Sequence, residues 1–280
     1  MTTDALDAAL AGLPQPLRDK MDRCRELLNA NRRVVVAFSG GVDSALLLAL
    51  ATGTLGTDHV LAAVGVSPSL PDSERRAAAD LAATLGVRVE QVATGEFDDP
   101  AFTANPPDRC FHCKTELLTR LKALAEREGF DAVVTGANAD DAGDFRPGLA
   151  AGKQLGAAAP LMDAGLTKAD IRAAAKALGL SVWDKPAAAC LASRVPYGQP
   201  ITPERLARIA QAEAVLADLG FAACRVRDHG RVARIEVPPD VIDRAVALRD
   251  RLVKPIKDLG FAYVTIDLEG FRSGSMNEVL

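Results

Sequence analysis

The sequence predicts an α/β protein, with a doubly wound parallel sheet followed by a smaller C-terminal α+β domain. Two observations predict this fold. Apolar runs of strand length alternate with segments of helical spacing through the N-terminal part of the chain. Beyond residue 184 the alternation gives way to a helix followed by successive strands, which is typical of a separate unit.

The first domain alternates helices and strands in a regular order. Residues 17–28 carry apolar side chains at helical spacing, and the unbroken apolar run at 34–38 is typical of a buried parallel strand. Further strands are expected at residues 60–66, 87–92 and 132–134, and helices at 72–85 and 114–128. This alternation predicts the doubly wound sheet.

A glycine-rich stretch at 135–156 interrupts the alternation, and a helix expected at 167–178 restores it. Thr167 is the expected N-cap of this helix, with Asp170 at the third position of a capping box. We expect the first domain to span residues 1–184 and the second to span residues 185–280. In the second domain we expect helices at 203–219 and 240–252 and strands at 223–226, 232–237 and 263–268.

Composition and charge exclude several classes of protein. With 280 residues, 49% hydrophobic and 25% charged, the chain can bury one large core or two modest ones. The net charge of -4 argues against a surface built to hold nucleic acid, so we expect a small-molecule ligand. An acidic N-terminus without a signal pattern, and no apolar run near roughly 18 residues, predict a cytoplasmic protein without a membrane partner.

The motif Ser-Gly-Gly-Val-Asp-Ser at residues 39–44 directly follows the first predicted strand. In an open parallel sheet, ligands bind beyond the carboxyl ends of the strands. The glycines let the backbone approach phosphate oxygens, and the helix that opens here directs its free amides toward an anion. We expect a nucleotide site in which Asp43 also holds Mg²⁺, formed by Ser39, Gly40, Gly41, Asp43 and Ser44.

A simpler interpretation of this motif is an ordinary glycine turn with an Asp or Ser N-cap. The motif is not followed by Gly-Lys-Ser/Thr, so it is not a Walker loop. It resembles the PP-loop of the ATP pyrophosphatases, which cleave ATP between the α and β phosphates and leave an adenylated substrate. Adenylation gives a carboxylate a good leaving group, which a nucleophile then displaces.

Five cysteines, an odd number, are expected to be thiols or metal ligands rather than disulfides in a reducing compartment. Cys110 and Cys113 form a CxxC at the opening of a helix, and Cys190 lies in a loop near the expected domain boundary. A CxxC alone can be half of a zinc site, a redox pair or two packed thiols. Cys24 and Cys224 are expected to be structural.

Six segments distributed along the chain carry a broader resemblance. They are Asn105–Cys110, Asp144–Gly148, Ala192–Gly198, Arg225–Arg227, Ala233–Glu236 and Gly270–Gly274. Together they resemble the LarE family of ATP-dependent sulfur transferases. The resemblance extends from Leu17 to Asn277 and so includes both expected domains.

The resemblance implies that ATP adenylates a pyridinium mononucleotide with two carboxylates, each of which becomes a thiocarboxylate in nickel-pincer nucleotide synthesis. In the better-known members, the cysteine that matches Cys190 gives up its own sulfur and becomes dehydroalanine. The additional Cys110 and Cys113 make this chain similar to three-cysteine members that hold a [4Fe-4S] cluster, in which one iron stays open for sulfide. We therefore expect a cluster on these three cysteines, with the sacrificial Cys190 as the alternative.

Several polar residues are candidates for binding the substrate. Arg225 and Arg227 alternate along a strand and suit a substrate phosphate, although a solvated strand face would show the same pattern. The resemblance also implies Ser193, Arg194 and Glu213, the last of which is equally consistent with an exposed helix charge. Residues whose roles stay open are Arg109, Asp141 and Asp144. His112 is expected on a helix surface and Trp183 in a core, and His229 is given no role.

Other functions are compatible with parts of this pattern. The first alternative is another PP-loop ligase, either an amidating enzyme similar to NAD synthetase or a tRNA-thiolating enzyme, although the acidic balance disfavours the second. A non-catalytic nucleotide-binding module would keep the glycines without needing Asp43 or the cysteines. We expect a homo-oligomer that acts on a small-molecule nucleotide.

Overall fold

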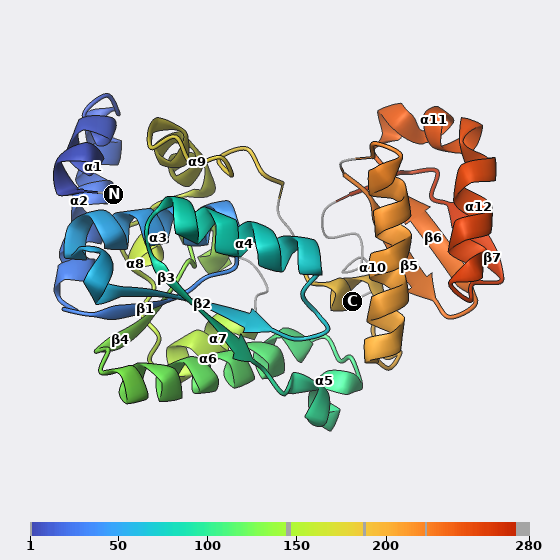
Figure 1. Cartoon of the computed structure of the whole chain (residues 1–280), viewed down its shortest axis with the longest axis horizontal. Coiled ribbons are helices and arrows are strands. Elements are labelled where there is room, and N and C mark those ends of the chain that lie inside the picture. The colour runs from blue at the N-terminus through green and yellow to red at the C-terminus, as the bar shows by residue number, and fades with distance from the viewer. Residues whose placement is uncertain (1, 144–146, 187–188, 222, 273–280) are drawn as a thin grey trace. The chain divides into compact units, whose positions relative to one another are not determined.

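The computed structural model describes residues 2–143, 147–186, 189–221 and 223–272. The chain divides into two compact units, whose elements are drawn in Figure 1. The first unit comprises Met1–Ser67, Asp72–Glu96 and Cys110–Ala188, and the second comprises Pro68–Pro71, Phe97–Arg109 and Ala189–Leu280. The domain boundary expected after residue 184 stays a prediction.

The first unit is built on a four-stranded parallel sheet with the order β3-β2-β1-β4. Its strands are β1 (Val34–Ala37), β2 (Val60–Val66), β3 (Arg88–Ala93) and β4 (Ala132–Thr135). In register, Val34 of β1 lies opposite Val60 of β2 on one side and Ala132 of β4 on the other. The parallel sheet expected from the sequence is therefore confirmed. The central β1 is buried at every position, which explains its unbroken apolar run.

Helices cover both faces of this sheet (Figure 1). On one face, α6 (Arg109–Glu128) packs Leu118, Leu121 and Leu124 against β1, β2 and β4. On the other face, α3 (Val42–Leu55) follows β1, and α4 (Asp72–Thr84) packs on β2 and β3. Most of α3 is buried, because α1 (Thr3–Leu10), α2 (Gln15–Asn29) and α9 (Lys168–Ala177) pack around it.

The expected capping box at the start of α9 is present. Asp170 N donates to Thr167 Oγ1 at 3.2 Å, and Thr167 N donates to an oxygen of the Asp170 carboxylate at 3.1 Å. Several shorter elements were not expected from the sequence, because most of them span only three to five residues. They are α5 (Pro100–Thr103), α7 (Pro147–Gln154), α8 (Pro160–Asp163) and the 3₁₀ helices η1 (Thr57–His59), η2 (Glu96–Asp98), η3 (Ala139–Gly143), η4 (Leu191–Arg194) and η5 (Pro239–Val241).

The second unit contains a three-stranded mixed sheet with the order β5-β6-β7. Its strands β5 (Arg225–His229) and β6 (Val232–Glu236) form an antiparallel hairpin, and β7 (Tyr263–Ile266) pairs parallel to β6. The core beneath them includes side chains from α10 (Pro203–Asp218) and α12 (Arg249–Asp258). The helix expected at 240–252 is two helices, α11 (Ile242–Ala247) and α12, which meet at Leu248.

None of the helices in the described part of the chain combines the length and the apolar character that crossing a lipid bilayer requires.

Asp228 holds α10 against β5 in the second unit. Its side chain is fully buried, and its carboxylate accepts hydrogen bonds from Arg208 Nε at 2.6 Å and Arg205 Nη2 at 2.9 Å. Arg208 Nη2 and the backbone amide of Gly230 also donate to it, each at 2.8 Å. Burial by itself raises the pKa of Asp228, but hydrogen bonds from Arg208, Arg205 and Gly230 together leave the pKa below its ordinary value.

We expect Asp228→Asn to lower the free energy of unfolding by about 3–5 kcal/mol, because it leaves two arginines beside a neutral side chain. Since the pKa is lowered in the folded state, the stabilisation is complete above the unfolded value of about 3.9 and is lost as the pH falls through the folded value. Urea denaturation from pH 7 down to pH 2 measures this, with the exposed Asp218→Asn as control. A difference between Asp228→Asn and wild type that persisted unchanged into strong acid would contradict the ion-pair explanation.

Candidate active site

The turn between β1 and α3 is held by hydrogen bonds among its own residues. Ser44 Oγ donates to the carbonyl of Gly41 at 3.1 Å, accepts from Ser39 N at 3.2 Å and lies 3.1 Å from Ser39 Oγ. Gly40 has a φ of +71°, and a Cβ added there would lie 2.9 Å from the Cβ of Ala78. Gly41 is the N-cap of α3, so the positive end of the helix dipole lies at this turn.

The loop after β4 packs against the first turn of α3. A Cβ added at Gly136 would lie only 2.9 Å from the backbone nitrogen of Ser44. Within the loop, Asn138 N donates to Asp141 Oδ2 at 2.9 Å, and Asp140 N donates to Asn138 Oδ1 at 3.0 Å. Asn138 and Asp141 are both buried. Asp141 therefore shapes the loop that borders the expected nucleotide site.

Asp43, the expected Mg²⁺ ligand, forms an ion pair. Its Oδ2 accepts from Lys168 Nζ at 2.5 Å, and its Oδ1 accepts from Asn138 Nδ2 at 3.4 Å. The side chain is 23% exposed, so solvent reaches the carboxylate. Carboxylate oxygens are ligands that Mg²⁺ prefers, and one that already attracts a cation fits a metal site.

Lys168 and Asn138 were not among the site residues expected from the sequence. A signal for Lys168 was present, because the predicted capping box places it at the first position of a helix, where the dipole disfavours a cation. Such a residue is expected to have an anionic partner. For Asn138 we find no comparable signal, because polar residues are ordinary in a glycine-rich loop.

The cysteines fall into two groups by exposure. Cys24 and Cys224 are buried, and burial raises the pKa of Cys24 to about 12 and that of Cys224 to about 11. Thiols with such pKa values stay protonated and unreactive. Cys110 and Cys113 lie three positions apart in the first turn of α6 and so share one face of the helix. Cys113 is half-buried, whereas Cys110 and Cys190 are exposed.

The iron-sulfur site expected on three cysteines is not visible as a cluster of ligands. Across residues 2–143, 147–186, 189–221 and 223–272, no three His, Cys, Asp or Glu side chains are grouped so that they could hold a metal ion. Cys110 and Cys113 belong to the first unit and Cys190 to the second. The meeting of the three thiolates therefore stays a prediction.

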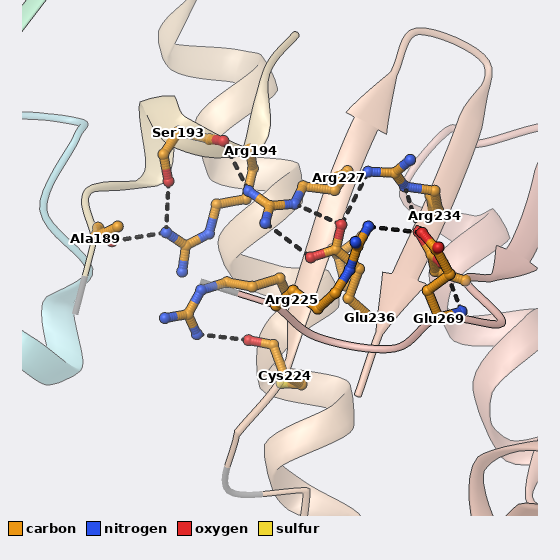
Figure 2. A network of polar contacts seen from close by, with 12 residues as sticks. Ala189, Ser193, Arg194, Cys224, Arg225, Arg227, Arg234, Glu236 and Glu269 are labelled. Carbon is orange, nitrogen blue, oxygen red and sulfur yellow. Dashed lines mark hydrogen bonds and ion pairs between the residues drawn. The ribbon is translucent and has the colours of Figure 1, made fainter. Parts of the chain in front are cut away.

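Arg194 fixes the backbone of the loop that carries Cys190 (Figure 2). Its Nη1 donates to the carbonyls of Ala189 at 2.7 Å and Cys190 at 3.0 Å, and Ser193 Oγ donates to the Cys190 carbonyl at 2.8 Å. Its Nε and Nη2 bind the two carboxylate oxygens of Glu213 at 2.9 and 3.1 Å. Glu213 is 16% exposed in its side chain and is not a solvated helix charge.

Arg227 on β5 forms a buried, bidentate ion pair with Glu236 on β6 (Figure 2). Its Nε and Nη2 donate to the two carboxylate oxygens at 2.9 and 2.7 Å, and its Nη1 donates to the carbonyl of Ser193 at 2.9 Å. Arg234 adds a bond to the same carboxylate at 2.9 Å. Each nitrogen of the Arg227 guanidinium thus donates a hydrogen bond within the protein. Arg227 therefore does not lie on a solvated strand face.

Arg225 lies two residues earlier on the same strand. Its Nη1 donates to the carbonyl of Cys224 at 2.7 Å, and its guanidinium lies 4.9 Å from the ring centroid of Phe271. Burial lowers the pKa of Arg225, and the positive charge of Arg194 lowers it further. A partly desolvated guanidinium in the field of a second positive charge favours a nearby anion, and the Glu213 carboxylate already supplies one to Arg194.

Arg109 and Asn105 form a clip within the second unit. Asn105 has a φ of +58°, and its Nδ2 donates to the carbonyls of Val195 at 3.2 Å and Pro196 at 2.8 Å. Its Oδ1 accepts from Arg109 Nη1 at 2.8 Å, and the Arg109 guanidinium lies 4.7 Å from the ring centroid of Tyr197. The clip joins the segment before the CxxC to the loop that follows η4.

The remaining candidates have structural surroundings. Trp183 is half-buried, with Lys176 Nζ 4.6 Å from its ring centroid. His112 contacts the ring of its neighbour Phe111 edge-on. His229 ends β5, where burial lowers its pKa. Asp144 lies outside the described residues, so its role stays open.

Comparisons with known proteins assign the family. The NAD synthase family model matches residues 17–120. An uncharacterised protein of Synechocystis sp. is 42% identical over 266 residues, which are 94% of this chain and 99% of that protein. The pyridinium-3,5-bisthiocarboxylic acid mononucleotide synthase of Lactiplantibacillus plantarum is 41% identical over 249 residues, which are 89% of this chain and 90% of that protein. The chain belongs to the LarE family.

The LarE resemblance found in the sequence is thereby confirmed over nearly the whole chain. The PP-loop fold is confirmed as well, because the NAD synthase match spans β1, the turn at 39–44 and α3. LarE proteins of this fold use ATP and Mg²⁺. The turn at 39–44 and Asp43 offer backbone amides and a carboxylate, the kinds of group that phosphate and Mg²⁺ bind, and their roles stay predictions.

We expect Arg227→Ala to lower the free energy of unfolding by about 3–5 kcal/mol, because it leaves the buried Glu236 carboxylate without its bidentate partner. Denaturant unfolding followed by circular dichroism measures the loss. Arg231→Ala is the matched control, since Arg231 is exposed in the turn between β5 and β6. Equal stability of the two variants would show that the Arg227–Glu236 pair does not hold the sheet together.

Proposed function

We propose that this LarE protein is an ATP-dependent sulfur transferase of nickel-pincer nucleotide synthesis. It adenylates a carboxylate of a pyridinium dicarboxylate mononucleotide, releases pyrophosphate and replaces the carboxylate with a thiocarboxylate. The observation that carries this proposal is the 41% identity, over 89% of the chain, to a synthase named for the bisthiocarboxylic product.

In the first step, a carboxylate oxygen of the substrate attacks the α-phosphorus of ATP, and pyrophosphate leaves with the electron pair of the broken bond. The turn at 39–44 binds the phosphates through its backbone amides and the dipole of α3. Asp43 would hold Mg²⁺, which supplies positive charge to the phosphate oxygens when it is bound. The product is an acyl adenylate, whose leaving group is AMP.

In the second step, a sulfur nucleophile adds to the acyl carbon and AMP leaves, so that the carboxylate has become a thiocarboxylate. Arg225 binds the substrate phosphate, because its guanidinium is partly desolvated and lies in the positive field of Arg194, whose own nitrogens are bound to Glu213 and to the loop at Cys190. Arg227 supports this pair by fixing Ser193 and the sheet. Ser193 and Glu213 hold Arg194 in position.

Cys110, Cys113 and Cys190 would hold a [4Fe-4S] cluster. The donor set fits this group, because three thiolates leave one iron open, two of them share one helical turn and none of the three is fully buried. When bound, the cluster supplies an exchangeable sulfide to the reaction. The chain's own part is to present Cys190 on a backbone that Arg194 and Ser193 hold.

Two other chemistries fit parts of the same site. In the first, Cys190 Sγ attacks the acyl carbon and AMP leaves, which gives a thioester. Loss of the Cys190 Cα proton with cleavage of its Cβ–S bond then leaves the thiocarboxylate and dehydroalanine, and the exposure of Cys190 favours this route. In the second, ammonia replaces sulfide and the product is an amide, which the match to the NAD synthase model favours. Mass spectrometry of the product and of the chain after turnover distinguishes all three.

We expect Asp43→Asn to leave a folded protein that releases pyrophosphate at least ~100-fold more slowly, because a neutral amide stabilises the charge on the departing phosphate less well. A coupled pyrophosphate assay with saturating ATP and substrate measures the rate. Asp140→Asn is the control, because it alters a neighbouring carboxylate that accepts a hydrogen bond from the backbone of Lys168. It should retain more activity than Asp43→Asn. Undiminished pyrophosphate release by Asp43→Asn would remove Asp43 from the site.

We expect anaerobic reconstitution of the wild type with iron and sulfide to give the broad charge-transfer absorbance of an iron-sulfur cluster. Any single Cys→Ala change among Cys110, Cys113 and Cys190 should weaken or abolish this absorbance, because each removes one of three ligands. Cys224→Ala is the matched control, since its thiol is buried and protonated. Dehydroalanine at position 190 after turnover would refute cluster-borne sulfide in favour of the sacrificial mechanism.

A further inference from the structure

The strongest feature that the proposed function leaves unused is the ion pair between Lys168 and Asp43. Lys168 Nζ lies 2.5 Å from Asp43 Oδ2, on the carboxylate that the magnesium ion of an ATP site would need. An ammonium ion and Mg²⁺ are both cations, and each competes for the same oxygen lone pairs. The lysine therefore takes up oxygen lone pairs that a metal ion would use.

Lys168 is held in this position against local preference. It is the first residue of α9, where the positive end of the helix dipole disfavours a cation. Its backbone amide donates to Asp140 Oδ2 at 2.8 Å, and Asp140 N donates in turn to Asn138 Oδ1 at 3.0 Å. Asn138 then donates to the other oxygen of Asp43. The backbone of Lys168 is thus fixed to the loop after β4, while its side chain is 35% exposed and has room to move.

We propose that Lys168 is a gate at the metal site: its ammonium closes Asp43 to free metal, and it transfers to the phosphate oxygens when the metal arrives with ATP. The inference rests on the use of ATP and Mg²⁺ in the proposed function, and not on the sulfur-transfer step. It assigns Lys168 as a positioning residue for the metal and as a direct ligand of the nucleotide.

The charge balance explains why the two events are linked. A divalent ion that arrives alone must displace the ammonium from Asp43, and the displaced ammonium loses this ion pair and is repelled by the ion. A metal that arrives on ATP brings phosphate oxygens within reach of the same side chain, so the ammonium exchanges one anionic partner for another. Metal binding is therefore expected to require nucleotide.

The chain offers a matched control for this lysine. Lys20 pairs with Asp170 at 2.7 Å. The side chains of Lys20 and Asp170 are 35% and 23% exposed, the same fractions as those of Lys168 and Asp43. Lys20→Met and Lys168→Met thus remove the same charge from equally exposed pairs, only one of which includes Asp43. Lys168→Arg keeps the charge and separates the effect of charge from that of side-chain shape.

The experiment measures Mn²⁺ binding by electron paramagnetic resonance, without nucleotide and then with ATP, and ATP affinity by calorimetry. Without nucleotide, Lys168→Met should bind Mn²⁺ at least ~10-fold more tightly than wild type or Lys20→Met, because its carboxylate is unpaired. With the metal present, Lys168→Met should bind ATP at least ~10-fold more weakly, because one charge-assisted hydrogen bond is lost. Lys168→Arg should resemble wild type without nucleotide.

Equal Mn²⁺ affinity of wild type and Lys168→Met would overturn the gate, and equal ATP affinity would overturn the transfer to phosphate. Circular dichroism and the ATP affinity of Lys20→Met show whether loss of a lysine disturbs the fold. Failure of the proposed sulfur transfer is recognised separately, because it would leave the metal and ATP measurements unchanged and would appear only as the absence of a thiocarboxylate product.

Discussion

The loop after β4 approaches the first turn of α3 so closely that no side chain fits at Gly136, and the geometry of the nucleotide site depends on this contact. Two backbones in contact leave little freedom for the residues that follow. Asn138 is directed at Asp43, and the loop's hydrogen bonds to Leu166 and Lys168 bring the start of α9 to the same place. The carboxyl edge of the sheet thus gathers three segments that are far apart in sequence.

In the second unit, ion pairs rather than backbone contacts fix the positions of the side chains. Carboxylates that are buried or nearly buried hold its arginines in place. Because a buried charge without a partner is costly, such an ion pair separates only when another interaction replaces it. Arg227 with Glu236 fixes the sheet, and Arg194 with Glu213 fixes the loop before η4. Such pairs contribute little net stability relative to apolar residues, but they allow few alternative arrangements. Arg225, whose pKa the positive charge of Arg194 lowers, lies on the strand that these pairs fix and stays the candidate for binding an anion.

The sequence predicted the parallel sheet, the turn at 39–44 and the capping box, because each has a local signature in period, glycine content or cap. It predicted that Arg225 and Arg227 share a face, but not that Glu236 binds one of them, since pairing across strands depends on register. Lys168 was missed for a related reason: 125 positions separate it from Asp43, and only folding brings the two together. The break at Leu248 was missed because α11 and α12 continue one apolar pattern.

In the part of the chain that the structure describes, the hydrogen bonds that hold the loop at Cys190 reach its carbonyl, from Ser193 Oγ and Arg194 Nη1, and not its sulfur. Removal of that sulfur would therefore leave the loop, and the 280-residue chain around it, with the same folded backbone. A chain that gave up its sulfur once would persist in the cell as an intact but inactive protein, competing for substrate with newly made copies. The proposed cluster-borne sulfide would remove this competition, because every copy would return to its starting state after each turnover.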